Sequence, residues 1–128
     1  MHQELQKKIL NRVDEISSGR TLCDRFVIAM EALLQMSPER FSELEGLTRE
    51  GGQVVFVSAD KRKIENSALQ TKPMKLPSGK WYVNASGGKV DFEIIIDASR
   101  TRLQLSVGFV EDLKRKTILR PRIKGVYE

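Results

Sequence analysis

The sequence is poor in the residues that most catalytic and metal-binding sites require. It contains one cysteine, Cys23, and one histidine, His2, among 128 residues. A single cysteine excludes an internal disulfide and is typical of proteins in a reducing cytoplasm. A lone histidine beside the first residue predicts neither a zinc site nor a Ser/His/Asp set, and no P-loop pattern occurs. We therefore expect a protein that is not an enzyme and uses no metal or cofactor.

Long hydrophobic stretches are also missing. Every unbroken apolar run spans only a few residues, so neither a membrane helix nor a secretory signal is predicted. With 40% hydrophobic and 30% charged residues, the chain has the composition of a single globular domain, here residues 1–128.

Acidic residues are scarce in the middle of the chain. Residues 57–89 contain seven Lys or Arg and two Asp or Glu, a net charge of +5, whereas residues 1–56 carry −2 and residues 90–128 carry +2. Within this part, residues 70–89 include four lysines, two prolines, three glycines and no acidic residue. A positive field concentrated in this way favours a polyanionic partner such as nucleic acid.

Residues 70–89 are predicted to form a loop and a hairpin. Pro73 and Pro77 favour extended backbone at and before their positions, and Ser78-Gly79 is typical of a turn. A short strand is predicted at residues 81–83, followed by a tight connection at residues 84–88. The alternative interpretation is an ordinary solvated loop beside an aromatic pair that packs in the core.

In the polyanion interpretation, the hairpin supplies contacts to phosphates and to bases. Four lysines would neutralise phosphates: Lys72, Lys75, Lys80 and Lys89. Asn84 and Ser86 have short polar side chains on a glycine-supported tip, so they are candidates for hydrogen bonds to base edges. The nearby run Lys61-Arg62-Lys63 is either a solvated helix face or a further phosphate contact.

Apolar spacing predicts an α+β domain, mainly helical, with a small antiparallel sheet or hairpin. Steps of three and four residues predict helices over residues 3–17 and 21–36, and Ser37-Pro38-Glu39 has the composition of a helix start. Residues 53–58 favour a strand, and Asp60 is placed to cap a short helix that ends near residue 67. The predicted core contains Phe26, Met30, Leu33, Phe41, Leu44 and Phe56.

The last third of the chain is predicted to contain a second hairpin. Apolar and polar residues alternate within residues 90–97, and a second apolar run covers residues 101–108. Alternation would place the carboxylates of Asp91, Glu93 and Asp97 on one face, where they could hold a metal ion as in a metal-dependent nuclease. Any half-exposed strand has the same pattern. A helix is predicted over residues 110–118, and residues 119–128 form a basic tail.

A series of residues in fixed order extends from residue 22 to about residue 90. Its central part consists of Leu69-Gln70-Thr71-Lys72-Pro73, Leu76-Pro77, Trp81-Tyr82-Val83 and Asn84. Upstream it includes Arg25-Phe26, Leu33-Leu34, Phe41 and the Val54-Val55-Phe56-Val57 run. In order and spacing, this series resembles the DNA-binding domain of the SeqA family, the bacterial negative modulators of replication initiation.

The resemblance implies a nucleoid-associated protein that binds double-stranded DNA and recognises hemimethylated GATC sites without a cofactor. It places Asn84 on the first of two family recognition asparagines, with Ser86 at the second and Lys89 in place of an arginine. A family Arg-Thr-Arg contact corresponds to Arg49-Glu50-Gly51-Gly52-Gln53 here. The candidate DNA-binding residues are Asn84, Ser86, Lys89, Gln70, Thr71, Lys72, Lys75, Lys80, Arg49 and Gln53.

Two further expectations come from the resemblance. It implies a helix within residues 90–108, where the local pattern predicts a hairpin. The family's separate N-terminal oligomerisation module has no counterpart, so an oligomer would use other surfaces. The alternative function is a module that binds protein or RNA through the basic hairpin; salt dependence and a preference for duplex DNA distinguish the two.

Overall fold

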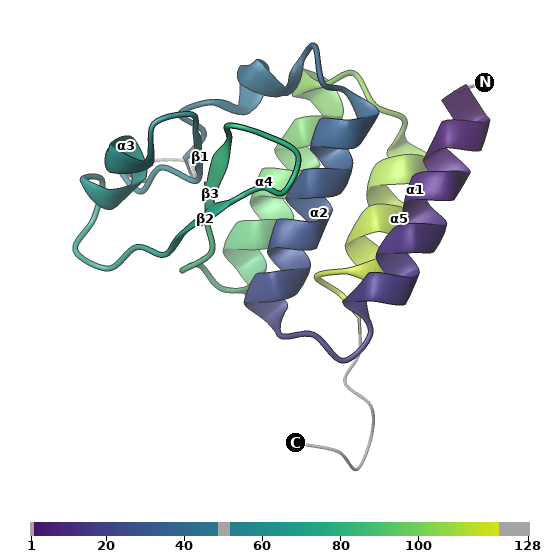
Figure 1. Ribbon diagram of the computed structural model, residues 1–128, viewed down its shortest axis with the longest axis horizontal. Coiled ribbons are helices and arrows are strands. Elements are labelled where there is room, and N and C mark those ends of the chain that lie inside the picture. The colour runs from purple at the N-terminus through teal and green to yellow at the C-terminus, as the bar shows by residue number, and fades with distance from the viewer. Residues whose placement is uncertain (1, 49–51, 121–128) are drawn as a thin grey trace.

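The computed structural model describes residues 2–48 and 52–120, which fold into helices packed beside a small sheet (Figure 1). In chain order the elements are α1 (His2–Ser17), α2 (Leu22–Met36), the 3₁₀-helix η1 (Phe41–Leu44), β1 (Val57–Ser58), α3 (Lys61–Glu65), β2 (Pro73–Lys75), β3 (Tyr82–Asn84), α4 (Lys89–Arg102) and α5 (Val107–Lys116). The predicted fold class, a mainly helical α+β domain, is confirmed. No helix of the described part is long and apolar enough to cross a membrane.

The four long helices form a bundle in which each packs against two others. α1 and α4 each pack on both α2 and α5 (Figure 1). At the centre, the rings of Phe26 in α2 and Phe92 in α4 stack with centroids 3.9 Å apart. All six core residues predicted from the sequence belong to one buried cluster: Phe26, Met30, Leu33, Phe41, Leu44 and Phe56.

The sheet lies between the helical bundle and α3 (Figure 1). Its strands are antiparallel in the order β1-β3-β2, and Val83 of the central strand lies opposite Val57 and Met74. These three side chains pack in or against the main core. Because side chains alternate along a strand, the other face carries Tyr82 and Asn84, and α3 contacts all three strands. The sheet is therefore covered on both faces.

The prediction of a hairpin within residues 90–108 is wrong. These residues form α4 and the start of α5, as the SeqA resemblance implied. The buried positions Phe92, Ile95, Ile96 and Ser99 step by three and four, which is the period of a helix face, and this packing outweighs the alternation. The α4 helix begins where the backbone N–H of Gly88 donates to the carboxylate of Asp91, 3.2 Å away.

Other predicted boundaries are only partly correct. Ser37 ends α2 rather than starting a helix, because its N–H donates to Leu33 O, and only η1 follows. The predicted strand at residues 53–58 reduces to β1 and a bridge between Val55 and Thr48. The helix capped by Asp60 is present as α3, and α5 starts three residues earlier than predicted, at a cap formed by Ser106. The predicted basic tail lies outside the described residues from position 121 onward.

Candidate nucleic-acid interface

The side chain of Asn84 is buried and joins three separate segments of the chain. Its Oδ1 accepts hydrogen bonds from the backbone N–H of Lys72 (3.1 Å) and of Ser86 (3.0 Å), and from Ser86 Oγ (2.6 Å). Its Nδ2 donates to Val55 O at 3.3 Å, and the residue is 0% exposed. In this arrangement the amide of Asn84 faces inward and holds the surrounding loops, while Ser86 is exposed.

The loop between β3 and α4, residues 85–88, is packed closely against its surroundings. A Cβ on Gly87 would lie 3.0 Å from Asp91 Cβ and 3.0 Å from Phe56 Cε1, closer than side-chain carbons normally approach. The backbone N–H of Ala85 donates to Lys72 O at 2.9 Å, which closes the loop against the start of β2. The loop conformation is therefore determined by tertiary contacts at both of its ends.

The turn between β2 and β3 is attached to the helical bundle. Leu76 N–H donates to Trp81 O at 2.9 Å, and Gly79 N–H to Leu76 O at 3.3 Å, so the predicted turn is present. The carboxylate of Glu31, a buried residue of α2, accepts from the backbone N–H of Ser78 (3.1 Å) and from its hydroxyl. Because a buried carboxylate requires donors, these bonds tie the turn to α2.

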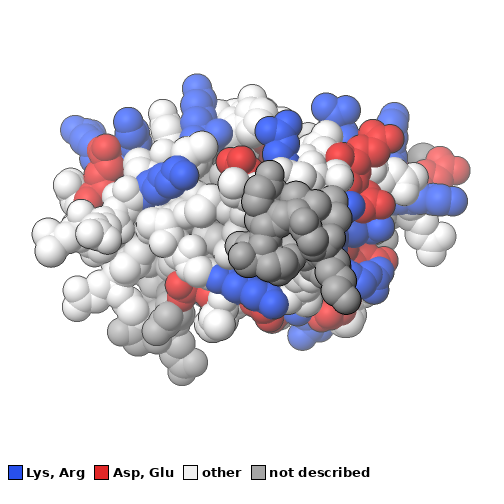
Figure 2. All heavy atoms as spheres, turned by 90° about the horizontal axis from the view of Figure 1, so that it is seen from below, with Lys and Arg blue, Asp and Glu red and all other residues white. Residues whose placement is uncertain are grey.

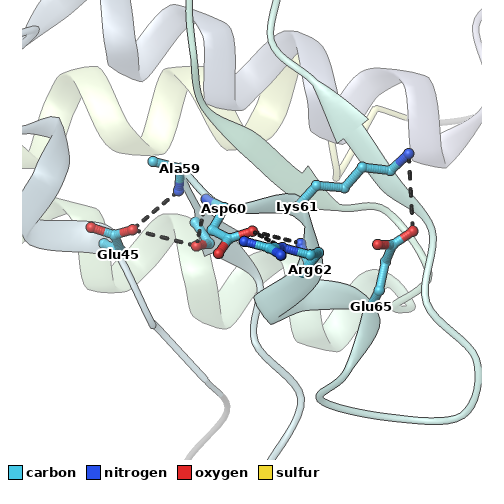
Figure 3. A network of polar contacts seen from close by, with 7 residues as sticks. Glu45, Ala59, Asp60, Lys61, Arg62 and Glu65 are labelled. Atoms are coloured by element: carbon cyan, nitrogen blue, oxygen red, sulfur yellow. Dashed lines mark hydrogen bonds and ion pairs between the residues drawn. The ribbon is translucent and has the colours of Figure 1, made fainter.

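The α3 helix is held by carboxylates at its first turn (Figure 3). Asp60 Oδ1 accepts from Arg62 N–H at 3.0 Å, and this bond holds the pKa of the Asp60 carboxyl below its ordinary value of 3.8. Glu45 accepts from the backbone N–H of Ala59 at 3.1 Å. Lys61 lies 3.9 Å from Glu65, an exposed pair one helical turn apart.

Several lysines of the central segment have no acidic partner among the described residues. Each of these five is exposed and forms no ion pair there: Lys63, Lys72, Lys75, Lys80 and Lys89. Lys80 does lie over the Trp81 ring, with its Nζ 5.8 Å from the centroid. Seen from below, Lys and Arg lie along one long margin of the molecule, and fewer Asp and Glu atoms accompany them at the sheet end than at the α1 and α5 end (Figure 2).

Three of these lysines, Lys72, Lys75 and Lys80, are distributed along the β2–β3 hairpin. Pro73 pairs with Asn84 at one end and Lys75 with Tyr82 at the other. Lys72 and Ser86 are adjacent at the first end because their N–H groups donate to the same oxygen. Ammonium groups without an acidic partner in the described part of the chain thus flank a fixed loop that carries one exposed hydroxyl, a combination suited to an extended anion.

The other candidate residues are less informative. Gln70 and Gln53 are exposed and Thr71 is half-buried, whereas Arg49 lies outside the described residues. The role of Glu31 was not predicted, because its partner Ser78 lies 47 positions away in the sequence. The close packing around Gly87 was also missed, although two adjacent glycines before a helix were the available signal.

The carboxylates proposed for a nuclease do not converge. Asp91, Glu93 and Asp97 lie on α4 rather than on a strand, and Asp97 Oδ1 is 2.7 Å from Lys114 Nζ. Asp91 accepts from the N–H of Gly88 at the helix start. Within residues 2–48 and 52–120, no group of three or more His, Cys, Asp or Glu side chains could hold a metal ion.

Comparison with known proteins identifies a shared fold. No family model matches the sequence, and no curated protein matches it. Among solved structures, the crystal structure of V. cholerae SeqA superposes with a TM-score of 0.68 and 16% sequence identity, covering 86% of this chain and 98% of that chain. The resemblance to SeqA noted in the sequence therefore extends to the fold of nearly the whole domain.

Proposed function

We propose that this protein binds double-stranded DNA without catalysis, through the β2–β3 hairpin and the loop that precedes α4. The observation that carries the proposal is the set of exposed lysines that have no acidic partner within residues 2–48 and 52–120, beside the fixed loop of residues 85–88. Such lysines bind phosphates and release counterions, which gives affinity for any sequence. The shared fold with V. cholerae SeqA supports the same partner class.

In its finer form, the proposal is a nucleoid-associated regulator of replication or transcription that responds to adenine methylation at GATC-like sites. Ser86 in the loop and Lys89 at the start of α4 are exposed and would face the groove, with Lys72, Lys75 and Lys80 on phosphates. Asn84 is assigned a positioning role, because its amide is already used within the protein.

The test compares three single substitutions that remove the same charge. Lys72→Gln and Lys89→Gln remove lysines beside the loop, and Lys8→Gln removes an exposed lysine of α1 as the control. Affinity for a 20-base-pair duplex is measured from low to physiological salt. Each loop-side variant should reduce the slope of log affinity against log salt by about 0.9, the value for one lost phosphate contact.

The control variant should retain the slope of the unmodified protein. Equal slopes for all three variants would contradict the proposal and favour a protein-binding module. Tighter binding to a matched RNA duplex or single-stranded RNA would instead favour the RNA alternative.

A further inference from the structure

One large apolar side chain among the described residues is completely exposed. Leu69, on the loop between α3 and β2, has 104% of its reference area open to solvent, whereas the other exposed large apolar residues have 36–66%. An apolar residue that is partly covered on a helix surface is ordinary. Leu69 differs because none of its area is covered within the described part of the chain. The others are Leu5, Ile16, Val90, Ile94, Val107 and Leu119.

The loop that carries Leu69 is held at both of its ends. At its start, Ser67 Oγ accepts from the backbone N–H of Val55 at 3.1 Å. At its end, the N–H of Lys72 donates to Asn84 Oδ1 at 3.1 Å, and Asn84 Nδ2 donates to Val55 O at 3.3 Å. In Figure 1 the loop between α3 and β2 projects from the sheet end of the molecule, away from the four long helices. Leu69 is therefore presented to the outside from a fixed base.

The same base supports the candidate DNA interface. Asn84 Oδ1 accepts from the N–H of Lys72 and from that of Ser86, so the loop of Leu69 and the loop of residues 85–88 meet at one oxygen atom. Leu69 precedes Lys72 by three positions, so the Cα atoms of these two residues lie within about 11 Å of each other. A duplex that contacts both Lys72 and Ser86 therefore passes within reach of Leu69.

The surroundings of Leu69 are basic. No acidic residue occurs between positions 66 and 89. The acidic residue before this stretch, Glu65, is paired with a lysine of α3. Lys63 and Lys72, on either side of the loop, are exposed and have no acidic partner within residues 2–48 and 52–120. Charge complementarity therefore selects a polyanion as the partner that covers Leu69.

We propose that Leu69 is an apolar wedge that enters the minor groove of the bound duplex and partly unstacks one base step. This inference rests on the proposed binding of double-stranded DNA. Leucine is one of the side chains that open base steps from the minor groove and bend a duplex. Because the side chain of Leu69 is uncovered in the described fold, all the apolar area that it buries on DNA is gained on binding. Pyrimidine–purine steps such as TA open most readily, so the wedge favours such a step at its position.

The experiment uses the full chain and three variants. Leu69→Ala removes the wedge, Leu69→Phe retains a large apolar side chain, and Leu5→Ala makes the matched change at an exposed leucine of α1. Affinity is measured for a duplex with a central TA step, and energy transfer between dyes at its two ends reports the bend. Melting temperatures of all four proteins are measured alongside.

The expected result is specific to the apolar side chain. Leu69→Ala should weaken binding by about tenfold, because most of the leucine contact is lost, and it should reduce the bend. The slope of log affinity against log salt should stay the same, because no phosphate contact is removed. The melting temperature should also stay the same, because the side chain of Leu69 is fully exposed. Leu69→Phe and Leu5→Ala should bind and bend the duplex as the unmodified protein does.

A second measurement isolates the opening of the stack. A series of duplexes carries one mismatched base pair at successive positions, and a mismatch lowers the cost of unstacking. At the step that Leu69 opens, the mismatch should strengthen binding of the unmodified protein by about three- to tenfold. Leu69→Ala should show no such gain at any position.

The outcomes separate this inference from the proposed function. If Leu69→Ala binds and bends the duplex as the unmodified protein does, the wedge is overturned and duplex binding stands. An unbent duplex with the unmodified protein, or no position at which a mismatch helps, also overturns the wedge. Binding to vesicles of anionic phospholipid that is tighter than duplex binding and is lost in Leu69→Ala would assign Leu69 to a lipid surface instead. No binding to any duplex at low salt overturns both proposals.

Discussion

Replacing Asn84 with alanine should destabilise the sheet region by an amount that follows from its hydrogen bonds. The substitution removes the hydrogen-bond partner of three backbone groups, the N–H of Lys72, the N–H of Ser86 and the carbonyl of Val55, and all three bonds are partly buried. With about 0.7–1 kcal/mol net for each of these three hydrogen bonds, the free energy of unfolding should fall by about 2–3 kcal/mol.

Denaturation and hydrogen exchange measure this effect directly. In a domain of this size, about 2–3 kcal/mol corresponds to a fall in melting temperature of roughly 6–15 °C. The amide hydrogens of Lys72 and Ser86 should exchange faster in Asn84→Ala, because Oδ1 no longer accepts from them. Urea denaturation gives the free energy, and exchange followed by NMR gives the two amides separately.

Asn66→Ala is the matched control. Asn66 is exposed at the end of α3, and its substitution should change the free energy of unfolding by less than about 0.5 kcal/mol. If Asn84→Ala were as stable as this control and the two amides exchanged at the original rates, the inward amide of Asn84 would be refuted.

Two further predictions concern packing and charge. Gly87→Ala should lower the free energy of unfolding by about 1–3 kcal/mol, because the added Cβ would lie 3.0 Å from atoms of Phe56 and Asp91. Gly108→Ala should instead raise the free energy of unfolding by about 0.5–1 kcal/mol, because Gly108 lies in helix α5 and has open space around it. Equal effects in urea denaturation would show that the space around the loop is not tight. The hydrogen bond from Lys114 to Asp97 raises the pKa of Lys114 above its ordinary value of 10.5. This ion pair therefore stabilises the folded protein below pH 10.5, and the stabilisation is lost as the pH rises through the raised pKa. Asp97→Asn should therefore be less stable by about 1 kcal/mol at pH 8, and the difference from the unmodified protein should close as the pH rises through the raised pKa of Lys114; a constant difference would contradict the assignment.

The sequence predicted the elements whose signals are local. The helices over residues 2–17 and 22–36 have apolar steps of three and four, and Asp60 caps α3 where its side chain can reach the next turn. The turn at Ser78-Gly79 also follows from neighbouring residues. In each case the stabilising contacts lie within a few positions of one another, so single-sequence patterns contain them.

The features that were mispredicted or missed depend on distant partners. The three consecutive isoleucines at residues 94–96 favour a strand locally, and only packing on Phe26 and its neighbours selects the helix. The burial of Asn84 depends on Val55, 29 positions away, and on Lys72, 12 positions away. A polar residue in a glycine-rich segment has the same sequence pattern whether its amide faces solvent or the interior.

The stacked pair Phe26 and Phe92 has a consequence for the thermodynamics of association. Phe92 lies in the first turn of α4, immediately after the loop of residues 85–88, and is fully buried. The loop is thereby anchored to the centre of the core within a few residues, so docking on a partner requires little ordering of the chain. The heat-capacity change of binding should then be that of two preformed surfaces meeting, without the large negative contribution that accompanies coupled folding.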